Sequence, residues 1–476
     1  MSIILNMFLS LLIVLFANGS EEGSPSQNQN SDIPTNSIYI KVGEAKLKKN
    51  LMAIPAFQYT GNPLAVKSHQ PTGALLFQTV QNNLSFTDYF KSVNPEAFLE
   101  DVANVNAIPA PADPKGFKFD SWLKIGVDFL MRANYSITDK TLTFETYVYH
   151  VPKAQLIMGK KYRGSVDATK KIANTFCNDL LKTLTGVEGP FLSKIVATSD
   201  RDGGQAREVF VMDWDGSNIR PISAHQAIAL SPAWSPDGRY VAYTAFVKHL
   251  NSGKTNSDLF LYDIVTNSRK ILSYRPGINS GAAFSPDGKS IFLTLSEDGN
   301  SDIFKIGLDG KVQKKITNGP NGAANVEPAL SPNGKLMAYS SERGGPASIY
   351  ILDIDDSNAK PKRITFAGQL NNSPSWSPDG KQIAFAGYDE GRFDVFIMNS
   401  DGSKLHRLTS AKKSNGKPAN NEHPSFSPDG RFIVFDSDRS GTNQIYVMAP
   451  DGSNERRVTQ DNHNYFKPKW SSNLEQ

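Results

Sequence analysis

The stretch that decides the fold is Trp376-Ser377-Pro378-Asp379-Gly380, followed by the alternating run Lys381-Gln382-Ile383-Ala384-Phe385. Proline presets φ at about −65°, aspartate hydrogen-bonds to the local backbone, and glycine accepts the positive φ that closes an antiparallel pair. The Ser-Pro-Asp-Gly segment is therefore expected to be a hairpin turn, with a strand that ends in an apolar residue before it and an alternating strand after it.

The same turn recurs along the C-terminal part of the chain, with asparagine replacing aspartate once. The five copies begin at Ser235, Ser285, Ser331, Ser377 and Ser427, at intervals of 50, 46, 46 and 50 residues. A third strand follows each copy, as in Asp394–Met398, and often an Asp-Gly turn and a short fourth strand. Four strands in a repeat of this length are typical of a β-propeller blade.

The two ends of the repeat region are each incomplete, and together they set the number of blades. Residues 194–223 supply second, third and fourth strands without a first, whereas Phe466–Ser471 repeats the strand before the turn with nothing after it. Five internal blades and one composite blade, closed by the C-terminal strand, predict a six-bladed β-propeller over residues 191–476. Closure of the ring would leave no open sheet edge.

Residues 38–190 alternate between strand and helix patterns, which predicts a small α/β domain. Strands are expected at 38–42, 51–57, 141–151 and 156–162. One helix is expected from about Gly73, a second carrying Trp122, Ile125 and Phe129, and a third around Cys177, the only cysteine. The fold class is therefore mixed: a small N-terminal α/β domain followed by an all-β propeller.

The N-terminus differs in composition from both predicted domains. Residues 3–16 are almost all apolar and end near the small residues Ala17 and Gly19, which predicts a signal peptide over 1–19. An uncleaved anchor is the alternative, because no basic residue precedes Lys41. Residues 20–37, rich in Ser, Asn, Gln and Glu, are expected to form a flexible linker.

The charge balance and the motifs favour a non-catalytic protein. The formal net charge is only +4, so no nucleic-acid partner is expected. No Gly-x-Ser-x-Gly motif is present. The alternative is a metal-dependent propeller lyase or lactonase, because His225, His423 and His463 all precede inner strands. Their offsets from the turns differ, so we expect solvated loop histidines, and no metal, cofactor, catalytic residue or small-molecule substrate.

The residues just before each inner strand should gather at one mouth of the central channel, and they are the predicted partner-binding site. Asparagine recurs in all five later loops, although asparagine and serine also commonly satisfy turns. The candidates are Asn279, Ser280, Asn325, Glu327, Asn371, Asn372, Asn421, Glu422, His423, Tyr465 and Phe466.

The repeated turns and two segments near the junction of the predicted domains resemble a known family. The repeated turns resemble the propeller anchors of the TolB family. Lys171–Asn178 resembles the helix that connects the two domains in that family, and Leu184–Phe191 resembles its Leu-Thr-Gly-x-x-Gly-x-Phe segment. Asn174 stands where that family usually has His, and Asn178 where it usually has Asp.

The resemblance implies a periplasmic scaffold of the Tol-Pal system that supports envelope integrity, cell division and protein transport. The implied partners are the outer-membrane lipoprotein Pal, bound by the propeller at the channel mouth, and TolA, bound by the N-terminal part. Other envelope proteins are further candidate partners.

Overall fold

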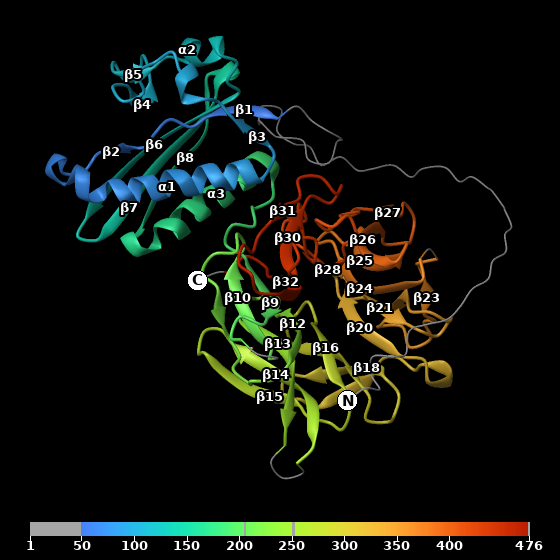
Figure 1. Cartoon of the computed structure of the whole chain (residues 1–476). Coiled ribbons are helices and arrows are strands. Elements are labelled where there is room, and N and C mark those ends of the chain that lie inside the picture. Colours follow the sequence, from blue (N-terminus) through green and yellow to red (C-terminus); the bar gives the residue numbers. More distant parts are fainter. Residues whose placement is uncertain (1–48, 204–205, 250–252, 367, 475–476) are drawn as a thin grey trace, which may run out of the picture. The chain divides into compact units, whose positions relative to one another are not determined.

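The computed structural model describes residues 49–203, 206–249, 253–366 and 368–474 (Figure 1). The predicted signal peptide, the linker and the strand at 38–42 lie outside these residues. Within the described ranges, none of the helices combines the length and the apolar composition that a membrane crossing requires.

The N-terminal part is a mixed sheet with helices on it. The sheet has the order β3 (Phe90–Ser92), β1 (Asn50–Ala53), β6 (Phe129–Thr138), β7 (Thr141–His150) and β8 (Gln155–Ser165), and β2 (Gln58–Tyr59) also pairs with β6. Strand β1 is parallel to β3 and β6, whereas β6, β7 and β8 are antiparallel. Helices α1 (Val66–Phe86) and α3 (Thr169–Thr185) pack side by side, and α3 lies against β8 (Figure 1). Strands β4 (Asn106–Pro109) and β5 (Gly116–Phe117) form a separate small sheet.

The helix expected to carry Trp122, Ile125 and Phe129 is shorter than predicted. Helix α2 spans Phe119–Lys124 and is followed by Gly126, whose φ of 74° is incompatible with its continuation. Phe129 instead begins β6, which the sequence did not predict as a strand. The first five residues of β6 are buried on both faces, so the strand lacks the alternation that identifies a half-buried strand. Phe129 follows Trp122 by seven residues and Ile125 by four, and this spacing matches one face of a helix only by coincidence.

Six four-stranded sheets form the rest of the described structure and make a six-bladed β-propeller (Figure 1). One sheet contains β11 (Arg220–Pro221), β10 (Glu208–Asp213), β9 (Lys194–Ser199) and β32 (Tyr465–Trp470). The next two contain β12 (Ala229–Trp234), β13 (Tyr240–Lys248), β14 (Thr255–Asp263) and β15 (Ser268–Ser273), and β16 (Asn279–Phe284), β17 (Ser290–Leu295), β18 (Asp302–Gly307) and β19 (Val312–Lys315). The last three contain β20 (Asn325–Leu330), β21 (Leu336–Ser341), β22 (Ser348–Asp353) and β23 (Lys362–Arg363); β24 (Leu370–Trp376), β25 (Gln382–Asp389), β26 (Arg392–Asn399) and β27 (His406–Arg407); and β28 (Asn421–Phe426), β29 (Ile433–Ser437), β30 (Gln444–Met448) and β31 (Arg456–Arg457).

The first of these sheets joins the two ends of the repeat region. Strand β32 pairs antiparallel with β9, with Tyr465 opposite Ser199 and Trp470 opposite Ile195. The Lys194 amide donates to Ser471 Oγ at 2.8 Å, and the Ser471 amide donates to the Lys194 carbonyl at 2.9 Å. The hydrogen bonds of β32 therefore close the ring.

The repeated turn has the structure that its residues predict. Ser235 Oγ donates to Asp237 Oδ1 at 2.5 Å and accepts from the Tyr240 amide at 2.8 Å, and Gly238 has a φ of 68°. The turns of neighbouring blades also touch, because a Cβ on Gly334 would lie 3.4 Å from the Pro286 ring. At Gly238 the neighbour is Leu474, from the tail that follows β32.

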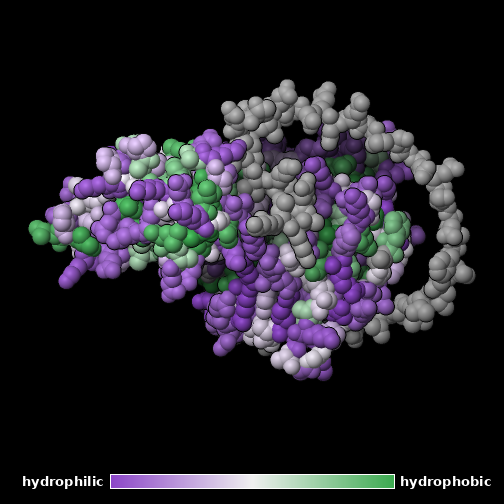
Figure 2. All heavy atoms as spheres, turned by 90° about the horizontal axis from the view of Figure 1, so that it is seen from above, coloured by the Kyte–Doolittle hydropathy of each residue, from purple (hydrophilic) through white to green (hydrophobic). Residues whose placement is uncertain are grey.

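The hydrophobic core of the propeller lies between adjacent sheets. Leu259 and Leu261 of β14 pack with Ile291 and Leu293 of β17, and all four are at most 4% exposed. Burial of an aliphatic side chain of this size contributes about 2 kcal/mol to folding. Figure 2 shows a mostly hydrophilic outer surface on the face in view, with scattered hydrophobic side chains. Single exposed hydrophobic residues such as Leu64 and Phe366 are ordinary on the surface of a folded protein.

Candidate partner-binding site

Every inner strand of the propeller is interrupted by a β-bulge at the same place. The register shifts within β12, β16, β20, β24, β28 and β32, two to four residues after the strand begins. In each bulge one residue adopts a positive φ of 49–66°, and a bulge re-aims the side chain of such a residue. These six residues, which we call the channel ring, are Ser231, Gly281, Glu327, Ser373, His423 and Lys467.

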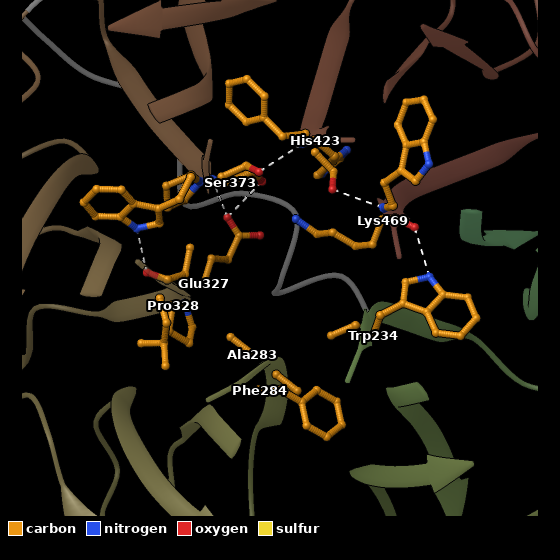
Figure 3. A pocket seen from close by; sticks show the side chains of 18 of the residues that line it. Trp234, Ala283, Phe284, Glu327, Pro328, Ser373, His423 and Lys469 are labelled. Atoms are coloured by element: carbon orange, nitrogen blue, oxygen red, sulfur yellow. Dashed lines mark hydrogen bonds between the residues drawn. The ribbon is translucent and has the colours of Figure 1, made fainter. Parts of the chain in front are cut away.

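The channel ring lines a cavity of about 310 Å³ (Figure 3). Two residues further along each strand, five blades present a small side chain and the sixth presents lysine. This second ring consists of Ala233, Ala283, Ala329, Ser375, Ser425 and Lys469. A third, apolar ring comes directly before the turns and consists of Trp234, Phe284, Leu330, Trp376, Phe426 and Trp470. The cavity is therefore polar at the level of the channel ring and apolar near the turns.

Glu327 is the acidic member of the channel ring, and its carboxylate is held by three donors. Lys467 Nζ lies 3.0 Å from Oε1, and Ser373 donates to Oε2 from its amide at 2.8 Å and from its hydroxyl at 3.0 Å. Burial raises the pKa of Glu327, but the charges of Lys467 and His423 and these hydrogen bonds outweigh it and lower the pKa to about 2. Glu327 is therefore ionised at neutral pH.

Lys469 is the charged member of the second ring. Its backbone carbonyl accepts a hydrogen bond from Trp234 Nε1 at 3.2 Å, and its side chain extends into the cavity toward Glu327 (Figure 3). Among the residues that the structure describes, its ammonium group has no hydrogen-bond or ion-pair partner. Burial lowers the pKa of Lys469 to about 8, with the neighbouring charge of Lys467 acting in the same direction and Glu327 opposing it.

His423 belongs to a second group of titratable side chains beside the cavity. Its Nδ1 lies 2.8 Å from Asp436 Oδ1, and Asp436 Oδ2 accepts from Asn443 Nδ2 at 3.1 Å. Burial and the charge of Asp436 raise the pKa of Glu422, with His423 opposing them. The ligand atoms of Glu422, His423 and Asp436 lie within 4.8 Å of one another, a donor set of the kind that holds divalent cations.

The three histidines that raised the metal-dependent alternative are not brought together. His225 Nε2 lies 3.0 Å from Tyr243 Oη, and His463 Nδ1 lies 3.9 Å from Asp200 Oδ1. Within the described ranges, the group with metal-ligand spacing includes His423 but neither of the other two. The three histidines therefore do not form a common metal site in the described structure. Their different offsets from the turns place the three imidazole rings in different surroundings.

Five of the predicted partner-binding residues are buried in links between blades: Asn279, Asn325, Asn371, Asn421 and Tyr465 are 0–3% exposed. Asn325 Nδ2 donates to Asp302 Oδ1 at 2.8 Å, and Asn421 Nδ2 donates to Asp394 Oδ1 at the same distance. Tyr465 donates to Asp461 Oδ2 at 2.7 Å. A partner cannot reach these side chains, so their expected contact with it is corrected to a structural role. Asn325 and Asn421 make equivalent links to an aspartate of the preceding blade, which gives asparagine a structural role at these two positions.

The other predicted residues are partly exposed. They are Ser280, Glu327, Asn372, Glu422, His423 and Phe466. Phe466 packs against the Arg207 guanidinium, whose carbon lies 3.9 Å from the ring centroid. The sequence reasoning missed Ser231, Ser373, Lys467 and Lys469. The sequence does contain a signal that identifies the channel-ring residues. Each of them stands four positions before the serine that begins the turn, or its equivalent Ser471, and five of the six are followed by proline.

The two asparagines that depart from the TolB pattern are both buried and used. Asn83 Nδ2 donates to Asn174 Oδ1 at 2.8 Å, which links α1 to α3. Asn178 Oδ1 accepts from the Phe191 amide at 3.1 Å, so it fixes the segment between α3 and the first propeller strand. Both asparagines therefore form hydrogen bonds through their side-chain oxygens.

Comparisons with known proteins agree with this architecture. The family model described as the TolB beta propeller domain matches residues 181–418 and 369–476. The Tol-Pal system protein TolB of Desulfosudis oleivorans is 33% identical over 280 residues, which are 59% of this chain and 60% of that protein. A TolB homologue of Chlorobaculum tepidum is 33% identical over 51% of each chain. The chain thus spans about half to three fifths of the length of these relatives.

A solved structure extends the likeness of fold beyond the propeller. The crystal structure of TolB from Acinetobacter baumannii covers 92% of this chain and 100% of its own, with a TM-score of 0.72 and 23% identity. At 23% identity, this match shows that the two folds are similar and nothing further. Because the family model spans more than half of the sequence, the chain belongs to the TolB β-propeller domain family.

Proposed function

We propose that this chain is a non-catalytic periplasmic scaffold of the Tol-Pal system that binds the outer-membrane lipoprotein Pal through the channel mouth of its propeller. Membership of the TolB propeller family supports the assignment, as do relatives that are named Tol-Pal system proteins. The proposed role is to support envelope integrity, cell division and protein transport. TolA is the proposed partner of the N-terminal part, including residues 20–37, which lie outside the described structure.

The observation that carries the proposal is the polar channel ring above an apolar floor. Protein interfaces commonly combine a desolvated centre with a rim of hydrogen-bonding groups. Here the cavity provides the centre, and Ser280, Asn372 and Glu422 are partly exposed polar groups on inner strands beside the channel-ring residues. A loop or peptide of a partner protein would fit this combination better than a rigid small molecule, because the polar groups come from several separate strands.

The domain map is part of the same proposal: a signal peptide at 1–19, a linker at 20–37, an α/β domain at 38–190 and the propeller at 191–476. Limited proteolysis with mass spectrometry tests it. Early cleavage between 20 and 37, and next near Gly186, would support the map. An early cut inside a blade strand would contradict it.

Titration calorimetry of the full chain with the soluble part of Pal from the same organism tests the partner assignment. Asn372→Arg should weaken binding by at least about tenfold, because it places a long charged side chain among the inner strands. Ser268→Arg is the matched control, since Ser268 is exposed on β15, the outermost strand of its blade. Absence of binding by the unmodified chain would overturn the proposal, and equal binding by the Asn372 variant would move the site away from the mouth.

A further inference from the structure

Lys469 departs from the symmetry of the propeller. At its position the other five blades have alanine or serine, and the backbone registers are equivalent, since Lys469 pairs with Val196 as Ala283 pairs with Phe292. The composite blade thus places one long cation where every other blade leaves space. Such a side chain is costly to bury in a channel without a counterion.

The charged groups around Lys469 compensate its ammonium only in part, because Glu327 and Asp436 attract it without forming an ion pair with it. The cavity wall contains two lysines and one glutamate, and these three side chains carry a formal charge of +1. Glu327 is engaged by Lys467 and Ser373, and Asp436 is engaged by His423, Asn443 and the Lys467 amide. Glu422 lies with His423 and Asp436. Each anion near the cavity is therefore held within another cluster.

We propose that the cavity binds a carboxylate at Lys469, and that this carboxylate is an acidic side chain of the protein partner docked at the channel mouth. The inference rests on the proposed function and adds to it the chemistry of the group that enters the channel.

The surroundings of Lys469 favour a carboxylate over other groups. A charge-assisted hydrogen bond to a lysine is stronger where water is partly excluded, and the third ring, with Trp234 and Trp470 next to Lys469, excludes water on the side of the turns. One carboxylate would neutralise the excess charge of the wall. A doubly charged phosphate would reverse it and would face the Glu327 carboxylate, which is ionised at neutral pH.

The lowered pKa of Lys469 gives this contact a characteristic pH dependence. The carboxylate binds the protonated ammonium, so affinity is nearly full at pH 7 and falls as the pH rises through the free-state pKa of about 8. Between pH 7 and pH 9 the charged fraction of a group with this pKa falls about tenfold, and affinity should fall by a similar factor.

Calorimetry with the soluble part of Pal tests the inference at pH 7 and pH 9. Lys469→Met should weaken binding about tenfold at pH 7 and remove the loss of affinity between the two pH values. Lys469→Arg should retain binding at pH 9, because arginine stays charged. Lys335→Met is the matched control, since Lys335 is exposed in the turn after β20. Thermal unfolding of each variant verifies that the fold is kept.

A second arm identifies the source of the carboxylate. Each aspartate and glutamate of the lipoprotein is changed to its amide, and one of these changes should weaken binding to the unmodified chain while having little further effect on the Lys469→Met variant. Sodium acetate serves as the probe for a free acid. If acetate binds through Lys469 and no amide variant loses affinity, the carboxylate is a small free acid and the protein source is wrong.

The outcomes separate the two levels of the proposal. If the unmodified chain does not bind the lipoprotein, the proposed function fails and the inference fails with it. If the unmodified chain binds and Lys469→Met binds equally well at both pH values, only the carboxylate site is overturned.

Discussion

Lys467 Nζ lies 3.0 Å from Glu327 Oε1, and this ion pair crosses the central channel. The inner strands contact one another in the order β32, β12, β16, β20, β24 and β28, and β28 contacts β32 again. Lys467 on β32 and Glu327 on β20 are thus three blades apart in a ring of six. The pair joins opposite sides of the propeller, and one of its members belongs to the strand that closes the ring.

We expect Glu327→Gln to destabilise the propeller by about 2 kcal/mol, because it leaves the Lys467 ammonium partly buried without its anion. Each side chain keeps 26% of its surface exposed, so the loss should be smaller than for a fully buried pair. Urea unfolding measures it. The double variant Glu327→Gln, Lys467→Met should recover part of the loss, and equal stability of the single variant and the unmodified chain would show that the pair contributes nothing.

The same ion pair predicts how the free energy of unfolding depends on pH under acidic conditions. The pKa of Glu327 is lowered from 4.5 to about 2 in the folded chain, so its contribution is complete above the unfolded pKa and disappears as the pH falls from about 4.5 to 2. Unfolding followed between pH 5 and pH 2 should show a smaller decrease in stability for Glu327→Gln than for the unmodified chain. Parallel pH profiles of the two proteins would contradict this assignment.

The propeller could be predicted from the sequence because its signal is local and repeated. Each Ser-Pro-Asp-Gly turn is determined by its own residues, and five copies with two complementary ends define six blades. Strand β6 could not be recognised in the same way, because a strand buried on both faces has no alternating pattern. Its assignment depends on the neighbours β1 and β7, which a single sequence does not reveal.

The sequence predicts a candidate site in the segments before the inner strands, but it does not predict which side chains line the channel. The bulges in the inner strands determine which residues of these segments face the channel. Asn325 precedes the bulge and is buried against Asp302, whereas Glu327 lies in the bulge and lines the cavity. The contact between Glu327 and Lys467, 140 residues apart, follows only from ring closure.

Gly238→Ala should destabilise the propeller by more than the cost of placing alanine at a positive φ, because the turn between β12 and β13 touches the tail after β32. An added Cβ would lie 1.9 Å from Leu474 Cδ2, in addition to the strain of alanine at a φ of 68°. Gly203→Ala is the matched control, because Gly203 has a φ of 85° and nothing within 4 Å of the added atom. Each strained alanine should cost about 1 kcal/mol.

The difference between these two variants in thermal unfolding isolates the Leu474 contact. Addition of Leu474→Ala should return Gly238→Ala toward the stability of the control. If Gly238→Ala and Gly203→Ala have the same melting temperature, the tail after β32 contributes no packing at this turn.

Removal of residues 464–476 should abolish cooperative unfolding of the propeller. The deletion removes β32, leaves β9 with an unpaired edge, and takes away Lys467, the ammonium partner of Glu327. Calorimetry of the truncated chain should show a broad or absent transition.

A synthetic peptide of residues 464–476 should restore part of the transition when it is added in excess, because binding to the folded ring stabilises it by mass action. A peptide in which Lys467 is replaced by Met should restore less, since it pairs with β9 but leaves Glu327 without its ammonium partner. An unchanged melting temperature of the truncated chain would mean that β9 does not need β32, and equal rescue by the two peptides would mean that closure depends on strand pairing alone.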